Sequence, residues 1–166
     1  MKINIKSGIK TYVCALLIIA ATLFIFSNSL KGPVESGNDS GRVTKAVVDV
    51  IESVKGEEIK ESEKEDIHHF VRKLAHFLEF AMLAFFVSAL VVFLSPKCRP
   101  YLFPYSLLYG LSGAVTDEFI QSFTGRGSAV KDVVIDFSGF ITGCAFVYLL
   151  SYLVNFIKIR KNRYGS

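Results

Sequence analysis

Four blocks of apolar residues divide the chain, over about residues 11–29, 74–95, 101–123 and 133–157. Each block is about 20 residues long, which is enough for a helix to cross a hydrocarbon core of about 30 Å. A polar segment, residues 31–73, separates the first block from the second. The pattern predicts an all-α integral membrane protein in which residues 1–166 form one domain. It has four transmembrane helices and an extracytoplasmic helical segment between the first and the second.

The polar segment itself has a pattern. Residues 31–41 are rich in turn-forming residues and are predicted to be irregular. Residues 42–54 repeat valine and isoleucine at helical spacing, which predicts an amphipathic helix that lies on the bilayer or caps a pocket. Lys55 and Gly56 end that helix. Ser62 and Glu65 form a capping box, which begins a helix that continues into the second span.

The first block has an alternative interpretation as a cleaved signal peptide. Lys2, Lys6 and Lys10 precede it, and residues 27–29 (SNS) loosely resemble a cleavage site. We expect it to be retained as a span, because its apolar run is long for a signal peptide.

The distribution of basic residues predicts the orientation of the spans in the membrane. Basic clusters without acidic residues precede the first block (residues 2–10), lie between the second and third (97–99) and follow the fourth (158–163). The positive-inside rule therefore places both termini and the loop SPKCRP in the cytoplasm. The composition, with 51% hydrophobic residues, agrees with a multi-pass protein of the plasma (cell) membrane. The expected partner is the lipid bilayer, and no nucleic acid is expected.

Five acidic residues lie outside residues 31–73, and all of them fall near the predicted outer end of a span. Ionisable residues at membrane depth are costly and mark functional sites by default. Helical spacing puts these acids on the same helix faces as small residues such as Gly139 and Gly143, which let helices pack closely. The sequence thus predicts an outward-facing polar pocket walled by the second, third and fourth spans, with Arg126 and Lys131 at its rim. Its predicted ligand-binding residues are Arg72, Lys73, His76, Glu79, Asp117, Glu118, Gln121, Arg126, Asp132 and Asp136.

Three motifs at this spacing resemble the VanZ-like family of small membrane proteins. They are RKLAHFLEF (residues 72–80), DEFIQSF (117–123), and Arg126 followed by KDVVIDFSG (131–139). The resemblance implies four spans and a role in the cell envelope. Members are named for a protein that gives low-level resistance to the glycopeptide antibiotic teicoplanin.

Position by position, Glu118 and Gln121 match the family's E-x-x-Q element, and Asp132 and Gly139 match its D-x-x-x-[DN]-x-x-G element. At Asp136 the resistance protein carries an amide, and it lacks a clear equivalent of His76 and Glu79. The chain is therefore similar to the broader family more than to its namesake.

Several functions fit this pocket. In the first, cations hold a phosphate or carboxylate of an amphiphilic ligand, which is a lipid-linked glycan, an anionic lipid or a glycopeptide, while the acids bind its hydroxyls or amines. In the second, an enzyme uses Glu118 or Asp136 as a general base with His76 as its acid–base partner, so these three are the catalytic candidates.

Other interpretations are weaker. A metal site would use His76, Glu79, Glu118 and Asp136, but no established metal signature is present, and neither a metal nor a cofactor is expected. Cys14, Cys98 and Cys144 show no metal or disulfide spacing. The charges could instead form structural pairs, Arg72 with Glu79 or Arg126 with Asp132. Transport is the least favoured function, because the lower half of the second span is apolar.

Overall fold

The computed structural model describes residues 5–94, 99–127 and 129–164, and over these residues it contains five helices and no strand. Lys2, Lys97 and Cys98 lie outside the described residues, as does most of the loop that was assigned to the cytoplasm. The helices are α1 (Ile5–Ser29), α2 (Pro33–Lys55), α3 (Glu61–Leu94), α4 (Arg99–Phe123) and α5 (Val130–Tyr164).

Three of these helices are long and apolar enough to cross a membrane, by length and composition. The candidate spans are Gly8–Ser29 in α1, Glu61–Leu94 in α3 and Val130–Asn162 in α5. The chain is therefore a multi-pass membrane protein. The predicted third span, residues 101–123, coincides with α4, but α4 is not among the candidates found. Tyrosines, serines, glycines and the pair Asp117 and Glu118 are spread along this helix, so no 18-residue stretch of it is as apolar as those in the three candidate spans.

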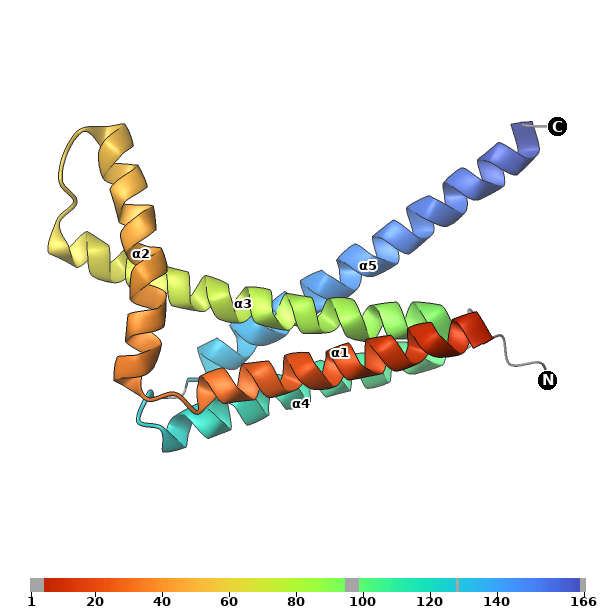
Figure 1. The fold of residues 1–166 in the computed structure, drawn as a ribbon, viewed down its shortest axis with the longest axis horizontal. Helices are drawn as coiled ribbons and strands as arrows, with labels where there is room; N and C mark the ends of the chain where they lie inside the picture. The colour runs from red at the N-terminus through yellow and green to blue at the C-terminus, as the bar shows by residue number, and fades with distance from the viewer. Residues whose placement is uncertain (1–4, 95–98, 128, 165–166) are drawn as a thin grey trace.

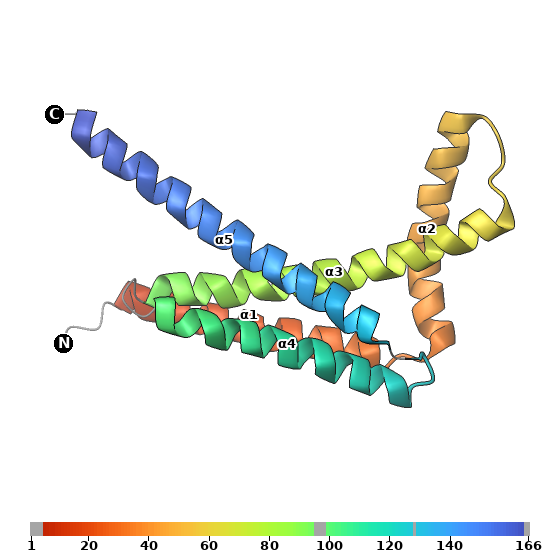
Figure 2. The ribbon, with the colours of Figure 1, turned by 180° about the vertical axis from the view of Figure 1, so that it is seen from behind.

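The long helices form a bundle with one divergent member (Figures 1 and 2). Helices α1, α3 and α4 lie side by side, and α5 crosses α3 and then leads away from the bundle towards the C-terminus. Helix α2 crosses the outer part of α3, far from the N-terminus. The end of α1, the end of α4 and the start of α5 consequently meet at one end of the bundle.

Close packing of α3 against α5 fixes the core of the bundle. Phe80 and Phe140 are fully buried there. A Cβ atom added to Gly139 would overlap the backbone carbonyl of Phe77, and one added to Gly143 would overlap that of Ala81. The small-residue stripe on α5 thus packs against α3, as predicted, and this contact brings the start of α5 beside the middle of α3.

The segment before α3 is more helical than predicted. Residues 31–41 were expected to be irregular, but α2 begins at Pro33, because proline suits the first turn of a helix, where no intrahelical N–H bond is lost. Gly56 ends α2 in the left-handed conformation (φ 72°) and donates its N–H to the Glu52 carbonyl. The predicted break at Lys55–Gly56 is confirmed.

Helix α3 extends well beyond the predicted second span. It begins at Glu61, one residue before the predicted capping box, and runs without interruption to Leu94. A continuous helix from the polar segment into the bundle is therefore confirmed. A hydrogen bond between the Ser40 hydroxyl and His68 Nε2 (2.8 Å) connects α2 to the N-terminal part of α3.

Candidate functional site

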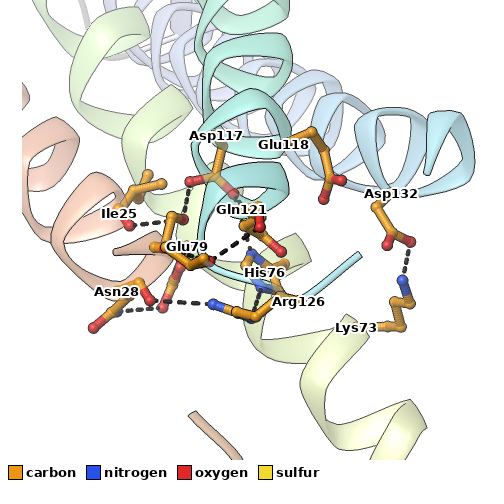
Figure 3. A network of polar contacts seen from close by, with 12 residues as sticks. Ile25, Asn28, Lys73, His76, Glu79, Asp117, Glu118, Gln121, Arg126 and Asp132 are labelled. Atoms are coloured by element: carbon orange, nitrogen blue, oxygen red, sulfur yellow. Dashed lines mark hydrogen bonds and ion pairs between the residues drawn. The ribbon is translucent and has the colours of Figure 1, made fainter. Parts of the chain in front are cut away.

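The predicted polar residues gather where α1, α3, α4 and α5 meet (Figure 3). A cavity of about 290 Å³ lies there, with α3 on one side and α4 and α5 on the other. Glu79 and Asp117 adjoin this cavity rather than line it. Its lining residues are His69, Arg72, Lys73, His76, Glu118, Gln121, Arg126, Gly127, Asp132 and Asp136.

Asp117 is the central acid of the site and is fully buried. One carboxylate oxygen, Oδ1, accepts a hydrogen bond from the Ser29 hydroxyl of α1. The other, Oδ2, accepts a hydrogen bond of 2.7 Å from the Gln121 amide one turn along α4, and lies 3.7 Å from His76 Nδ1. Asp117 therefore joins three helices.

Arg126 reaches into the site from the loop between α4 and α5. The glycines on either side of it, Gly125 and Gly127, have positive φ angles (76° and 68°), which ordinary side chains rarely adopt. Its guanidinium donates to the Asn28 carbonyl (3.1 Å) and lies 3.3 Å from His76 Nε2, and its Nε has no partner among the described atoms. Burial, and then the nearby positive charge of Arg72, lower the pKa of Arg126.

The contact with Arg126 defines the tautomer of His76. A guanidinium has donors only, so His76 Nε2 must be the acceptor of this hydrogen bond. The imidazole proton of a neutral His76 is then on Nδ1, on the side of Asp117. Nδ1 is buried and has no hydrogen-bond partner within the described part of the chain.

The remaining acids differ in how well their oxygens are satisfied. Glu118 accepts the backbone N–H of Ala129 (3.1 Å), and Glu79 accepts the side-chain amide of Asn28 (3.0 Å). Asp136, only 1% exposed, lines the cavity, and its Oδ2 has no hydrogen-bond partner among residues that the structure describes. A buried carboxylate oxygen without a donor is energetically costly, so Asp136 is the least satisfied acid of the site.

The charge pairs considered from the sequence are replaced by another pair. Lys73 forms a hydrogen-bonded ion pair with Asp132, joining α3 to the start of α5. Neither Arg72 with Glu79 nor Arg126 with Asp132 forms an ion pair in the described structure. Arg72 lines the cavity without a hydrogen bond or ion pair to any described residue, so its guanidinium is available to a ligand.

A second cavity, of about 390 Å³, adjoins the first and lies between α2 and α3. Most of its wall is apolar, and the side chains that make it so include Val43, Val47, Phe70, Leu74 and Leu78. Arg72, His76 and Arg126 line both cavities. A groove with apolar walls therefore opens onto the polar cavity at the site of the two arginines.

The sequence interpretation missed one wall of the site and misplaced one residue. Asn28 and Ser29, at the end of α1, supply partners to Glu79, Asp117 and Arg126, so the site has four walls rather than three. The signal was available, since these polar residues end the first apolar block at the level of the acids. Lys131, predicted at the rim, is exposed and lines neither cavity.

Three side chains of the site are spaced as metal ligands could be. One ligand atom each from His76, Asp117 and Asp136 lies within 4.8 Å of the others. This set differs from the one considered from the sequence, because Glu79 and Glu118 instead accept hydrogen bonds from Asn28 and Ala129. With Nε2 of His76 facing Arg126 and the proton on Nδ1, however, a metal would have to displace either that proton or Arg126 to bind the imidazole.

An all-helical multi-pass bundle with acids and arginines gathered at one end defines the class of this protein: a small membrane protein with a polar site built between its spans. The model of the VanZ/LLP1 family matches residues 13–151, most of the chain and all of the site, and the chain belongs to that family. No curated protein and no solved structure matches this chain.

Proposed function

We propose that this VanZ/LLP1 protein binds an amphiphilic ligand of the cell envelope in a pocket that faces outward. The observation that carries the proposal is the junction of two cavities, one polar and one with mainly apolar walls, at Arg72, His76 and Arg126. An amphiphile needs such a pair: an apolar groove for its chain and charged groups for its head. Guanidinium groups bind phosphate and carboxylate through paired hydrogen bonds.

The outward direction of the pocket rests on a proposed four-span topology. Helix α4 has 25 residues, or about 37 Å, which is long enough to cross a bilayer of about 30 Å. It lies side by side with α1 (Figures 1 and 2), and its acids point into the protein rather than towards lipid. With α4 as the third of four spans, the basic clusters at 2–10 and 158–163 place both termini in the cytoplasm.

The chemistry of the two cavities suits a lipid-linked glycan precursor, an anionic lipid or a lipoglycopeptide. All three combine a hydrocarbon chain with phosphate or carboxylate groups and with hydroxyls. A protein that sequesters or shields such a ligand at the outer face would lower susceptibility to teicoplanin-type antibiotics without any chemical reaction. This is the route by which we connect the site to the resistance for which the family is named.

The test is native mass spectrometry of the protein purified in a mild detergent, to identify a bound amphiphile. We expect the wild type to carry a bound amphiphile with a phosphate or carboxylate in its head group. Its occupancy should fall about tenfold in Arg126→Gln, since a charge-assisted contact contributes about 1.5–3 kcal/mol. Arg160→Gln, far from the site on α5, is the matched control. Equal occupancy in both variants would refute the proposal.

An enzyme is the second candidate, because His76 and Asp136 line one cavity and each has a buried polar atom without a partner. In this case Asp136 or Glu118 takes a proton from the bound head group, and His76 donates or relays one. Replacing these carboxylates by amides separates the two functions. Glu118→Gln and Asp136→Asn abolish an acid–base reaction but leave binding by the arginines in place.

A further inference from the structure

The charges in the polar cavity are separated along its length. Arg72 and Arg126 lie where it joins the apolar groove between α2 and α3. Asp136 and Glu118 line the polar cavity but not the groove. Asp136 is also one helical turn, about 6 Å, further along α5 than Asp132, the acid that pairs with Lys73. The groove carries charged residues of its own, Lys31, Asp39 and Glu79. A ligand that passes from the groove into the polar cavity meets the two arginines first and Glu118 and Asp136 beyond them.

At the acidic end of the cavity the neighbouring cation, Lys73, is already engaged by another acid. Oδ2 of Asp136 is buried and unbonded, while the lysine next to it on α3 is paired with Asp132. The guanidinium of Arg126 contacts Asn28 and His76 rather than Asp136. A carboxylate buried in this way favours a ligand that brings both positive charge and N–H donors.

A metal ion or a primary ammonium could supply the positive charge next to Asp136, and the hydrogen bonds of His76 favour the ammonium. A metal ion held by His76, Asp117 and Asp136 requires a lone pair on the imidazole. Arg126 takes up the lone pair of Nε2, so a metal would have to displace either the proton on Nδ1 or Arg126 itself. A primary ammonium requires only oxygen acceptors, which Asp136 and Glu118 provide without any change at His76 or Arg126.

We infer that the ligand of this site is a zwitterionic amphiphile whose head group carries a phosphate and a primary ammonium, as in phosphatidylethanolamine. The inference rests on the proposed function and specifies its ligand. The phosphate lies between Arg72 and Arg126, the ammonium binds Asp136 with Glu118 beside it, and the hydrocarbon chain occupies the groove along Val43, Val47 and Leu74. The cavities of about 290 and 390 Å³ are together within the range of small-molecule sites, about 300–1,000 Å³.

The experiment compares defined lipids in competition for the purified full chain, with native mass spectrometry as the readout. The probes are dioleoyl phosphatidylethanolamine, its mono-, di- and trimethylated forms, and dioleoyl phosphatidylglycerol, which has the phosphate but no amine. We expect the wild type to prefer phosphatidylethanolamine over phosphatidylglycerol by about tenfold or more. Each added methyl group should weaken binding, because it removes an N–H donor and enlarges the head.

Asp136→Asn should remove the preference between the two lipids, and its binding of phosphatidylglycerol should be at least as strong as that of the wild type. This variant is expected to fold, because the amide nearly preserves the shape of the buried side chain. Glu58→Gln, an exposed acid outside the site, is the matched control and should keep the wild-type preference.

The outcomes separate this inference from the proposed function. Equal binding of the two lipids by the wild type, with both lost in Arg126→Gln, overturns the ammonium site and leaves amphiphile binding intact. Binding of both lipids that Arg126→Gln does not alter overturns the proposed function itself. Stoichiometric zinc or manganese in the wild type, absent from Asp136→Asn by elemental analysis, overturns the ammonium site in favour of a metal.

Discussion

Three acids of the pocket each accept one hydrogen bond from another segment of the chain. Asp117 has Ser29 from α1, Glu79 has Asn28 from α1, and Glu118 has the N–H of Ala129 from the loop. Such hydrogen bonds add little net stability when present but leave a costly unsatisfied group when one member is removed. We therefore expect substitutions at the polar end of α1, Asn28 and Ser29, to destabilise the protein although they remove few atoms.

Removal of the Ser29 hydroxyl tests this expectation. We predict that Ser29→Ala lowers the free energy of unfolding by about 1–3 kcal/mol, because it leaves Oδ1 of the buried Asp117 without its donor. Ser27→Ala is the matched control, since that exposed hydroxyl bonds only the carbonyl of its own helix. Unfolding by sodium dodecyl sulfate in mixed micelles, followed by circular dichroism, provides the measurement.

A double-mutant cycle of Ser29→Ala and Asp117→Asn then measures the interaction energy between these two side chains. A coupling energy of about 1 kcal/mol or more is expected for two groups in direct contact. Additive effects of the two substitutions would show that Ser29 acts through something other than Asp117.

At the scale of elements, the pocket depends on the close contact of α3 with α5. Gly139 and Gly143 face backbone atoms of α3 that cannot move aside, whereas a Cβ on Gly113 of α4 would meet only the ring of Phe80 at an ordinary 3.6 Å. The two α5 glycines thus set the distance between the helix that carries Arg72 and His76 and the helix that carries Asp132 and Asp136.

We predict that Gly139→Ala destabilises the protein by about 1–3 kcal/mol, the usual cost of inserting a methyl group into a packed interface. It should also weaken amphiphile binding, because α5 must shift away from α3. Gly113→Ala should change neither property by much, since its methyl group has room. Comparable losses in the two variants, measured by thermal unfolding and by lipid occupancy, would contradict this account of the interface.

At the scale of the whole molecule, the helices divide into a compact group and a divergent one. Helices α1, α3 and α4 run side by side, while the second half of α5 departs from them (Figure 2). Apolar side chains in this part of α5, such as Leu153 and Phe156, are exposed. An apolar helix surface of this kind suits lipid rather than water. The divergence leaves the pocket end of α5 in place, because the glycine contact lies before the helices separate.

The four-span topology makes a prediction for the whole chain. In a variant without the native cysteines, Lys131→Cys and Glu58→Cys should react with a membrane-impermeant maleimide in intact cells, and Lys158→Cys should react only after lysis. If α4 does not cross the membrane, residues 97 and 131 lie on the same side. The same behaviour of Lys97→Cys and Lys131→Cys, whether both react in intact cells or both react only after lysis, would therefore contradict the proposal.

Local pattern was enough to predict the all-helical class of this protein and most of the polar residues that meet at the site. Apolar blocks, the small-residue stripe and the position of the acids predicted an all-helical membrane bundle, and the ten predicted residues gather around one site. The extent of α2 was missed, because Pro33 and the glycines after it favour turns in isolation, and the packing of α2 on α3 outweighs that preference.

The sequence alone determined which helices form and which faces of them are polar, since both follow from spacing along a single segment. The pairing of the charges was decided by tertiary structure: Lys73 with Asp132, Ser29 with Asp117 and Asn28 with Glu79 join residues 51 to 88 positions apart. Helical periodicity gives the direction of a side chain around its own axis but not the distance to a neighbouring helix. For the same reason the sequence could not show that Oδ2 of Asp136 has no hydrogen-bond partner among the described residues. Nor could it show that Arg72 and Arg126 lie at the mouth of an apolar groove.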